Sequence, residues 1–360
     1  MRYLDIHILQ TVPLSALNCD DVGEPKTATF GGVARMRISS QAWKYATLAQ
    51  LRRDHPSTDW GVLTTRAADM IAEAMPERDY PRPPAQLAAD LLAAAKIAVH
   101  GTGDNHTQGR TKAMLRIGAR EADALAELLA AAAETGQQPA AREVTAALTA
   151  HPPVCAVLFG RMVAKRLDLR IDAAVSTAHA IGVSAAETTL DFYTAMDNLA
   201  TDSSAAGFFG TTGFGSSTLY RYATVDLDRA RACLGQDTTA IITAYLRAWI
   251  TSMPSGRTAE TAPRTLPHLV SVALREQQPL NLSTAFASAL PATATATEAA
   301  HRLLTEAADF ERFYNMAPAA AWTLSTLPDL AHERLGPLRT LDEIITGVAA
   351  TLSPAPAGAR

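Results

Sequence analysis

The class of fold is decided by the stretch Tyr3-Leu4-Asp5-Ile6-His7-Ile8-Leu9, close to the start of the chain. Apolar and polar residues alternate in it and strand-forming side chains dominate, so it predicts a β-strand. Further strands are predicted at 154–159, 173–183, 218–227 and His268–Leu274. Helices are predicted from Ser39 or Ser40 to about Arg53, through much of 58–149, over Thr238–Met253, and near 281–290, 297–315 and 339–352. Early and late strands with helices between them indicate an α+β fold built on a sheet layer.

Three glycine-containing segments are predicted to lack regular structure or to form turns. Residues 11–37 form the longest of them, and long loops inside compact proteins usually carry function. Residues 101–109 are polar and predicted to form an exposed loop. Residues 200–217 contain Gly, Ser and Thr together with Phe208 and Phe209, which predicts a mobile loop or a long hairpin with exposed aromatic side chains.

Charge is distributed unevenly along the chain. Of its 360 residues 48% are hydrophobic and 19% charged, which excludes a disordered protein, and the net charge of −4 argues at first against a nucleic-acid partner. Basic residues are nevertheless concentrated in 25–53, 107–120 and 160–170, which together carry a net +13 while the rest of the chain carries −17. Phosphate binding depends on such local fields, although each segment alone is also compatible with an ordinary solvated surface.

The first basic segment has the composition of a phosphate-binding surface. Gly31-Gly32 would allow a ligand to approach the backbone closely, and the helix that begins at Ser39 or Ser40 would offer free amides to an anion. On that helix Gln41 and Lys44 share a face and are able to follow one nucleic-acid backbone.

The cysteines and the lengths of the apolar segments indicate where in the cell the protein is expected. Cys19, Cys155 and Cys233 are widely spaced and form no C-x-x-C motif, so neither a zinc site nor a redox pair is expected. Reduced thiols of this kind are typical of cytosolic proteins, and we expect a cytoplasmic protein without cofactor or metal. The first residues lack the apolar core of a secretion signal, and no apolar run reaches the ~18 residues that span a membrane, so no membrane contact is expected.

The sequence contains no complete catalytic motif of the P-loop, dinucleotide-binding or G-x-S-x-G type. His100 and His106 are able to ligate a metal, although a flexible surface loop is the simpler interpretation. Asp20 and Asp21 are compatible with two roles, a metal site for RNA cleavage or ordinary hydrogen bonds within a turn. His7 is expected to be packed and hydrogen-bonded rather than to act as a general base.

Several of these residues belong to motifs of a known family. The motifs are Ile6-His7-Ile8-Leu9, Leu17-Asn18-Cys19-Asp20-Asp21, Lys26, Phe30-Gly31-Gly32, Arg37-Ile38-Ser39-Ser40-Gln41 with Lys44, Gly160-Arg161-Met162, Ala173–Ile181, Asp191-Phe192-Tyr193-Thr194-Ala195 and Leu219-Tyr220-Arg221-Tyr222. Through them the chain resembles the Cascade backbone subunit of type I-E CRISPR systems, a guide-RNA-binding protein of the RAMP superfamily. The helical insertion and the C-terminal third resemble that family only in layout.

The resemblance implies an α+β fold shaped like an open right hand. An RRM-like (ferredoxin-like) palm would comprise residues 1–57, 150–190 and 218–360, helical fingers residues 58–149, and a β-hairpin thumb residues 191–217. It also implies a non-catalytic protein of antiviral defence, without cofactor, in which each thumb folds over the RNA of the next copy and displaces one nucleotide. The implied partners are crRNA, target DNA, further copies in a helical filament, and the large, small, guide-capping and guide-processing endonuclease subunits of Cascade.

The resemblance also assigns contacts to individual residues. Guide RNA would be held by Lys26, Ser39, Gln41, Lys44 and Arg161, with Met162 as a wedge beside a kinked base and Phe208 and Phe209 as the base-displacing thumb tip. Further candidates are Arg35, Arg37 and Lys165 for RNA, and Asn18, Arg110 and Lys112 for RNA or DNA. Cys19 and Tyr45 stand where many relatives have a basic residue, and Tyr45 would either stack on RNA or pack inside the protein.

Two other functions remain as alternatives. One is a backbone that cleaves target RNA with a metal held by Asp20 or Asp21, as in the related type III effectors. The other is a guide-processing endoribonuclease with His7 as its base.

Overall fold

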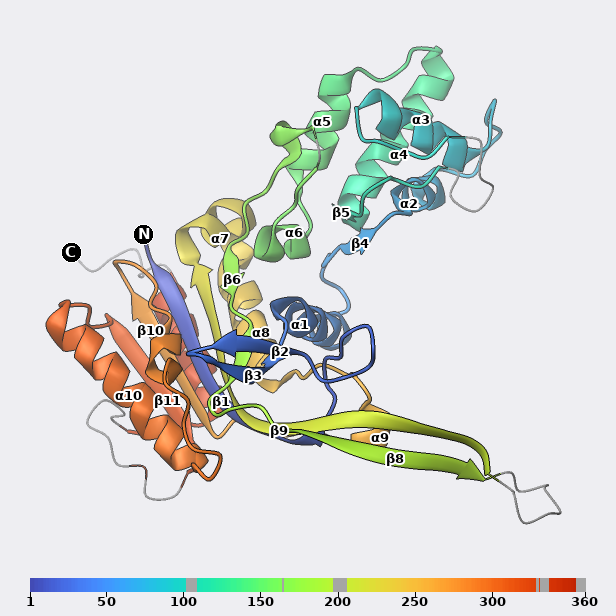
Figure 1. Cartoon of the computed structure of the whole chain (residues 1–360). Coiled ribbons are helices and arrows are strands. Elements are labelled where there is room, and N and C mark those ends of the chain that lie inside the picture. The colour runs from blue at the N-terminus through green and yellow to red at the C-terminus, as the bar shows by residue number, and fades with distance from the viewer. Residues whose placement is uncertain (102–108, 164, 197–205, 328–329, 331–336, 354–360) are drawn as a thin grey trace, which may run out of the picture. The chain divides into compact units, whose positions relative to one another are not determined.

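A computed structural model describes residues 1–101, 109–163, 165–196, 206–327, 330 and 337–353 (Figure 1). The chain divides into two compact units, the first formed by Met1–Gln50, Thr177–Asp228 and Asp237–Arg360 and the second by Leu51–Ser176 and Arg229–Gln236. Each unit has a hydrophobic core of its own. By this division residues 51–57, 150–176 and 229–236 of the predicted palm belong to the second unit.

The first unit is built on a sheet with the strand order β11-β10-β1-β9-β7-β3-β2. Its strands are β1 (Tyr3–Ser15), β2 (Thr27–Phe30), β3 (Val33–Ile38), β7 (Ala180–Gly182), β9 (Ala206–Asp226), β10 (Leu269–Arg275) and β11 (Ala320–Ser325), while β6 (Val175–Thr177) and β8 (Thr188–Met196) also pair with β9. The first strand, β1, lies between β9 and β10 and pairs antiparallel with both. The predicted α+β class is therefore confirmed, with an antiparallel sheet.

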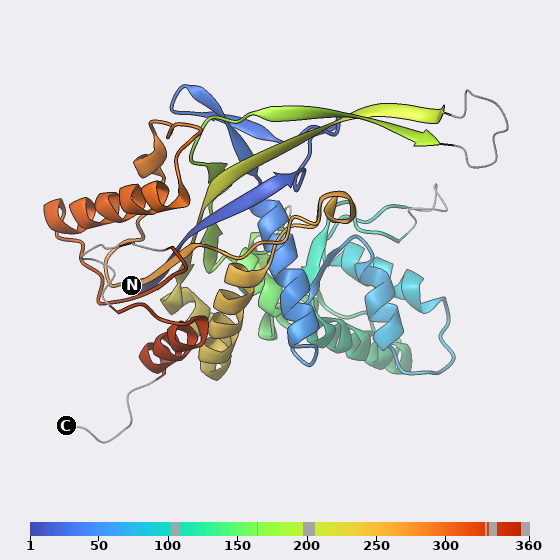
Figure 2. The same cartoon turned by 90° about the horizontal axis from the view of Figure 1, so that it is seen from below.

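Helices pack on both faces of this sheet (Figures 1 and 2). On one face α10 (Ala296–Phe313) and the short 3-10 helix η3 (Leu282–Phe286) form a core with Leu9 and Tyr220. On the other lie α1 (Ser40–Asp54) and α8 (Thr238–Thr251), joined by an edge contact between Trp43 and Trp249, with α11 (Leu341–Leu352) beside α8. Because both faces are covered, every residue of β10 is buried. The short helix α9 (Thr258–Thr261) also belongs to the first unit, whereas α7 (Leu227–Leu234) and η2 (Gly235–Asp237) lie largely in the second.

The polar residues of β1 are buried rather than turned to solvent. The carboxylate of Asp5 accepts hydrogen bonds from the Tyr222 hydroxyl (2.9 Å), from Nε of Arg275 (2.8 Å) and from the backbone N–H of Leu280 (2.9 Å). Burial raises the pKa of Asp5 above its usual value, and these donors oppose the rise. The alternation thus predicts the strand correctly, but its polar side chains form hydrogen bonds inside the protein instead of facing solvent.

The predicted loop at residues 11–37 is wrong over about half of its length and holds for residues 16–26, which belong to no helix or strand. The first strand continues to Ser15, and β2 and β3 form a hairpin in which Phe30 pairs with Val33. Gly31 and Gly32 form its two-residue turn, with φ values of +61° and +83°. Positive φ at both positions is what a tight hairpin turn requires and what glycine adopts without strain.

The strands β8 and β9 extend from the sheet as a long two-stranded ribbon (Figures 1 and 2). Their pairing runs from Thr188 opposite Gly215 to Met196 opposite Ala206. Of the two structures predicted for 200–217, the long hairpin is confirmed over 206–217, and residues 197–205 lie outside the described part of the chain.

The second unit is mainly helical, as predicted for 58–149. Its elements are α2 (Ala67–Ala74), α3 (Pro84–Ala94), α4 (Ala119–Thr135), α5 (Ala141–Ala150), α6 (Val154–Phe159), the 3-10 helix η1 (Leu167–Leu169), and a small sheet of β4 (Val62–Thr64) and β5 (Leu115–Ile117). Ile71, Leu92 and Leu125 are fully buried in its core.

Three local predictions need correction. The apolar run 154–159 forms the helix α6 instead of a strand, beginning after Pro153 and ending at Gly160, because a short apolar run does not distinguish the two structures. The strand predicted at 173–183 is divided into β6 and β7. The helix predicted near 281–290 is the 3-10 helix η3.

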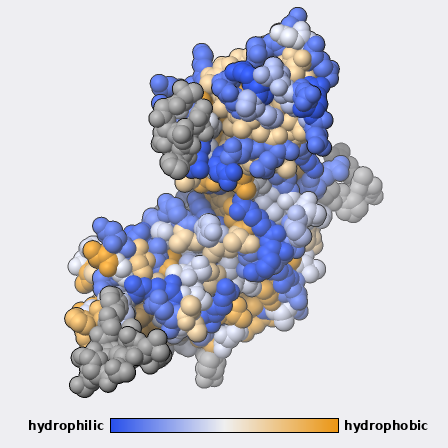
Figure 3. All heavy atoms as spheres, turned by 90° about the vertical axis from the view of Figure 1, so that its right-hand side faces the viewer, coloured by the Kyte–Doolittle hydropathy of each residue, from blue (hydrophilic) through white to orange (hydrophobic). Residues whose placement is uncertain are grey.

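The face drawn in Figure 3 carries hydrophilic side chains over much of its area, with hydrophobic residues interspersed in small groups. Among the described residues on this face, no broad hydrophobic surface is present. The described helices include none that is long and apolar enough to cross a membrane.

Candidate nucleic-acid interface

Hydrogen bonds join Asn18 to separate parts of the first basic segment at the start of α1. The backbone N–H of Lys26 donates to the carbonyl of Asn18 (2.9 Å), and the N–H of Arg37 donates to the carbonyl of Lys26 (2.9 Å). The side-chain oxygen of Asn18 accepts the backbone N–H of Ser39 (2.9 Å). The structure therefore brings these four predicted residues together.

The first turns of α1 add a polar and aromatic surface to this group. Gln41 is exposed and Lys44 is half-buried. Tyr45, which comes directly after Lys44, is 72% exposed. Packing inside the protein, one of the two roles left open for Tyr45, is thereby excluded within this chain.

His179, which was not predicted, lies beside the same group. It is exposed between β6 and β7, and its Nδ1 accepts the backbone N–H of Ser40 (3.0 Å). Partial burial and then the positive charges of Arg37 and Lys44 lower the pKa of His179. The only sequence signal was its place in the motif Ala-His-Ala-Ile, because the contact depends on the pairing of β7 with β3.

The amides at the start of α1 are largely occupied by the protein itself. The N–H of Ser39 is bonded to Asn18, that of Ser40 to His179, and that of Ala42 to the Ser39 hydroxyl (3.2 Å). The predicted use of free helix amides as an anion site is therefore not supported. The positive field here comes from side chains instead.

Arg35 does not face solvent. Its side chain is fully buried, and the guanidinium donates to the carbonyls of Gly182, Val183 and Phe286, each at 3.0 Å. Burial lowers the pKa of Arg35, and its bonds connect β3 to two other segments of the first unit. We therefore leave it out of the candidate interface.

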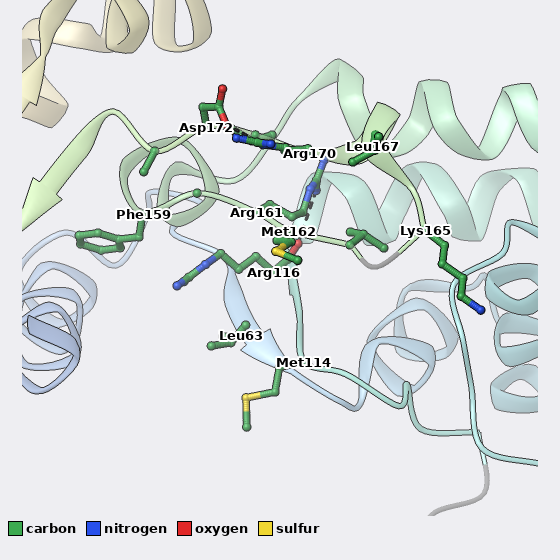
Figure 4. Close-up of a pocket in the computed structure, with 14 residues that line it drawn as sticks. Leu63, Met114, Arg116, Phe159, Arg161, Met162, Lys165, Leu167, Arg170 and Asp172 are labelled. Atoms are coloured by element: carbon green, nitrogen blue, oxygen red, sulfur yellow. Dashed lines mark hydrogen bonds and ion pairs between the residues drawn. The ribbon is translucent and has the colours of Figure 1, made fainter.

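In the second unit, the segment that follows α6 lines a pocket of about 590 Å³ (Figure 4). Met162 and Leu167 are exposed on it by 83% and 82%. Its other labelled residues include the cations Arg116, Lys165 and Arg170 and the apolar Leu63 and Met114. Apolar walls combined with positive charges suit the face of a nucleotide base and the charge of its phosphate.

Arg161 supports this segment from inside. Its guanidinium is buried, pairs with the buried Glu121 carboxylate at 2.6 Å, and donates to the carbonyls of Leu148 (2.5 Å) and Leu169 (3.1 Å). The backbones of Arg161 and Ile171 exchange two hydrogen bonds of 2.9 Å, which close the loop between them. Burial raises the pKa of Glu121 to about 7, and Arg161 opposes the rise. Arg161 thus holds Met162 and Lys165 at the surface, and we leave it out of the direct contacts.

The candidates of the second basic segment are both exposed. Lys112 lines a smaller hollow of about 150 Å³, together with Met114 and Met162, and its backbone N–H donates to Ala98 (2.8 Å). Arg110 lies two residues earlier and accepts the N–H of His100 (2.8 Å) through its carbonyl. Lys112 is therefore the one of the two that the structure brings beside Met162.

On the β8–β9 hairpin, Phe209 is 66% exposed, and its ring centroid lies 6.0 Å from that of Phe192. The backbone of Phe208 pairs with Ala195, and its side chain lies outside the described part of the structure. An exposed aromatic surface on the hairpin is thus present at Phe209.

Two residues of the catalytic alternatives, Asp20 and His7, have structural roles. Oδ1 of Asp20 accepts the backbone N–H groups of Val22 (3.1 Å) and Glu24 (2.9 Å), as turn chemistry predicts. His7 is buried, and its Nδ1 is bonded to the Tyr220 hydroxyl (2.9 Å). Within the described ranges, no group of three or more His, Cys, Asp and Glu side chains is arranged to hold a metal.

Comparison with known proteins matches residues 4–346 to the family model described as "CT1975-like protein". The chain belongs to the CT1975-like family. This CT1975-like chain is similar to one chain of a "CRISPR RNA-guided surveillance complex, pre-nicking", with 28% identity, a TM-score of 0.85, and coverage of 98% of this chain and 100% of the other.

A chain of a second solved "CRISPR RNA-guided surveillance complex" has 26% identity, a TM-score of 0.74, and coverage of 96% and 99%. No curated protein matches the sequence. The resemblance to Cascade backbone subunits that the sequence motifs predicted is thereby confirmed for this CT1975-like protein.

Proposed function

We propose that this CT1975-like protein is the guide-RNA-binding backbone subunit of a Cascade surveillance complex of type I-E. The observation that carries the proposal is its similarity over 98% of its length to a complete chain of an RNA-guided complex. Because the similarity extends over the whole of that chain, it supports the same role for this one. The basic residues around Lys44 and Lys165 provide positive charge to bind the phosphates of an RNA backbone.

In this proposal the copies stack along crRNA in a helical filament and present the guide in short segments to target DNA. The antiparallel sheet serves as an RRM-like palm, the helical segment 58–149 as fingers and the hairpin 191–217 as a thumb. The other partners are the large, small, guide-capping and guide-processing endonuclease subunits. The protein itself is non-catalytic, since base pairing supplies the specificity and separate subunits supply the chemistry. Its location in this proposal is the cytoplasm.

The candidate residues contact different parts of the RNA according to their chemistry. Lys26, Arg37 and Lys44 neutralise phosphates, while Gln41 bonds to phosphate or ribose oxygens, so these contacts do not depend on the base sequence. Met162 enters the stack beside a kinked base, because an exposed thioether replaces base stacking at modest cost.

In the second unit Lys112 and Lys165 provide positive charge beside Met162. On the hairpin, Phe208 and Phe209 press on the displaced position. Stacking of this kind tolerates any base, as a guide-coating protein requires.

The test is to express the chain with a guide RNA, purify it by a tag, and treat the complex with ribonuclease. Guide RNA should co-purify and be protected at regular intervals along the spacer. Purified protein that carries no RNA and binds none when it is added would overturn the proposal.

The same complex distinguishes the catalytic alternatives. Complementary RNA with Mg²⁺, and separately an unprocessed guide precursor, should both remain intact. Regular cleavage that is lost in Asp20→Ala or Asp21→Ala would show a cleaving backbone, and cleavage of the precursor that is lost in His7→Ala would show a processing enzyme.

A further inference from the structure

Two cations and a histidine from three separate segments of the chain lie close together in the first unit. Arg37 is on β3, Lys44 is on α1, and His179 is exposed between β6 and β7. Arg37 pairs with Ile181 of β7, two residues after His179, and Lys44 lies one helical turn after Ser40, whose backbone N–H donates to His179 at 3.0 Å. The positive charges of this group attract an anion. Its members belong to different sequence motifs.

We propose that His179 contacts an RNA phosphate in this group, as a neutral hydrogen-bond donor through Nε2. The inference rests on the proposed function, to which it adds a residue with a stated chemical role. Arg37 and Lys44 supply the charge that brings the phosphate, and His179 supplies a directed N–H.

The hydrogen bond at Nδ1 fixes the protonation of the ring. Nδ1 accepts the backbone N–H of Ser40, so it carries no proton, and the proton of the neutral ring is on Nε2. A second proton on Nδ1 would break the bond to Ser40. The low pKa of His179 agrees with a ring held neutral by its surroundings.

The neutral ring suits a phosphate diester better than it suits a base. A single N–H donor beside two cations matches an oxygen that is always ionised. A contact of this kind is also insensitive to base identity, as the proposed coating of any guide requires.

Two substitutions separate the two nitrogens of His179. His179→Asn keeps an acceptor near the position of Nδ1, so the bond to Ser40 is retained, but it has no donor at the position of Nε2. His179→Gln reaches the position of Nε2 with an amide donor and loses the bond to Ser40. His301→Asn, on α10, is the matched control.

The assay is binding of a single-stranded RNA without terminal phosphates, followed by fluorescence anisotropy over a range of salt concentrations. Terminal phosphates are omitted because their second ionisation falls near pH 6. Thermal unfolding of each variant is measured alongside. At pH 7.5, His179→Asn should weaken binding about three- to tenfold without a change in the salt slope, because a neutral donor releases no counterion.

The other variants should behave differently. His179→Gln should bind RNA almost as the unmodified protein does, while its thermal midpoint falls by about 2–4 °C because the backbone N–H of Ser40, at the start of α1, loses its acceptor. His301→Asn should change neither. Equal RNA affinity in His179→Asn and the unmodified protein would overturn the inference, provided that the unmodified protein binds RNA; if it does not, the proposed function itself fails.

If His179 bound RNA in its protonated form, the pH dependence of RNA affinity would differ. The charged groups that act on His179 are Arg37 from β3 and Lys44 from α1. If affinity rises as the pH falls from 8 to 6, and His179→Asn removes that rise, then His179 binds as a cation and the neutral-donor assignment is wrong.

Discussion

Replacement of Arg161 by methionine tests whether this residue is an internal support or an RNA contact. Arg161→Met keeps much of the apolar stem and removes the guanidinium. The buried Glu121, whose carboxylate lies 2.6 Å from that guanidinium, then has no counter-charge. The carbonyls of Leu148 and Leu169 lose a donor as well.

The structure sets the size of the effect. The side chains of Arg161 and Glu121 are 1% and 0% exposed, so water replaces none of the lost bonds. Removing one partner of such a pair typically costs about 3–5 kcal/mol of stability. In the double variant Arg161→Met with Glu121→Gln no buried charge remains, so the loss should be smaller than in Arg161→Met alone.

The pH dependence of stability follows from Glu121. Burial raises its pKa to about 7 in the folded protein, so the folded state binds this proton more tightly than the unfolded state does. The resulting stabilisation is complete at low pH and is lost as the pH rises through 7, with a size of ~3 kcal/mol. Arg161→Met removes a group that lowers this pKa, so its penalty should be larger at pH 8 than at pH 5.

Hydrogen exchange followed by mass spectrometry measures the effect locally, at peptides from α4 and from residues 160–171. Arg161→Met should speed exchange there by roughly 10²–10⁴-fold, the equivalent of the expected loss. Arg170→Met is the matched control, because Arg170 pairs with Asp172 at the surface, where such a pair contributes about 1 kcal/mol or less. Unchanged exchange in Arg161→Met, with an RNA salt slope reduced by one, would show that Arg161 is a phosphate contact and refute the support role.

Three further predictions concern the interface and the β2–β3 turn. Lys44→Ala should weaken RNA binding equally for all guide sequences and reduce the salt slope by about one in a titration against salt, whereas a loss confined to some guides would contradict a phosphate contact. Met162→Ala should leave guide coating intact and slow pairing with complementary DNA in a strand-pairing assay; loss of coating itself would contradict the wedge role. Gly31→Ala should destabilise the protein to urea more than Gly32→Ala, because a Cβ at Gly31 would lie 1.5 Å from the carbonyl oxygen of Ala287, while Gly32 has nothing within 4 Å and loses only the ~1–2 kcal/mol of its left-handed backbone. Equal losses would show that the contact with Ala287 is unimportant.

Elements with a long periodic pattern were predictable from the sequence. The helices α8 and α10 and the strand β10 lie within two residues of their predicted ends, because each buries a continuous apolar surface. The strand β11 was missed because its six residues, Ala320–Ser325, show little alternation and extend the sheet at the edge of β10. The sequence predicts a close ligand approach at Gly31-Gly32, although two glycines between short strand-forming runs also predict the hairpin turn that the structure shows.

The candidate site was predicted where charge and exposure agree. Lys26, Lys44 and Lys165 lie in the basic segments and remain available at least in part to a ligand. Arg35 and Arg161 lie in the same basic segments but are buried. The guanidinium of Arg35 donates to carbonyls far away in the sequence, and that of Arg161 pairs with Glu121 and donates to the carbonyls of Leu148 and Leu169. Net charge along the chain does not distinguish a cation that holds the fold together from one that faces RNA.

Two features of the site needed the folded chain. His179 joins Lys44 only because β7 pairs with β3, a contact between residues about 140 apart in the sequence. Met114 reaches the same pocket as Met162 through the β4–β5 sheet and the loop that precedes it. Neither carries a local pattern that differs from an ordinary surface residue.

The most direct test of the central claim is native mass spectrometry of the chain co-expressed with guide RNAs whose spacers differ in length. A backbone that polymerises along its guide should add copies in regular steps as the spacer lengthens, with the same number of nucleotides per added copy. A fixed number of copies on every guide, whatever its length, would contradict the account.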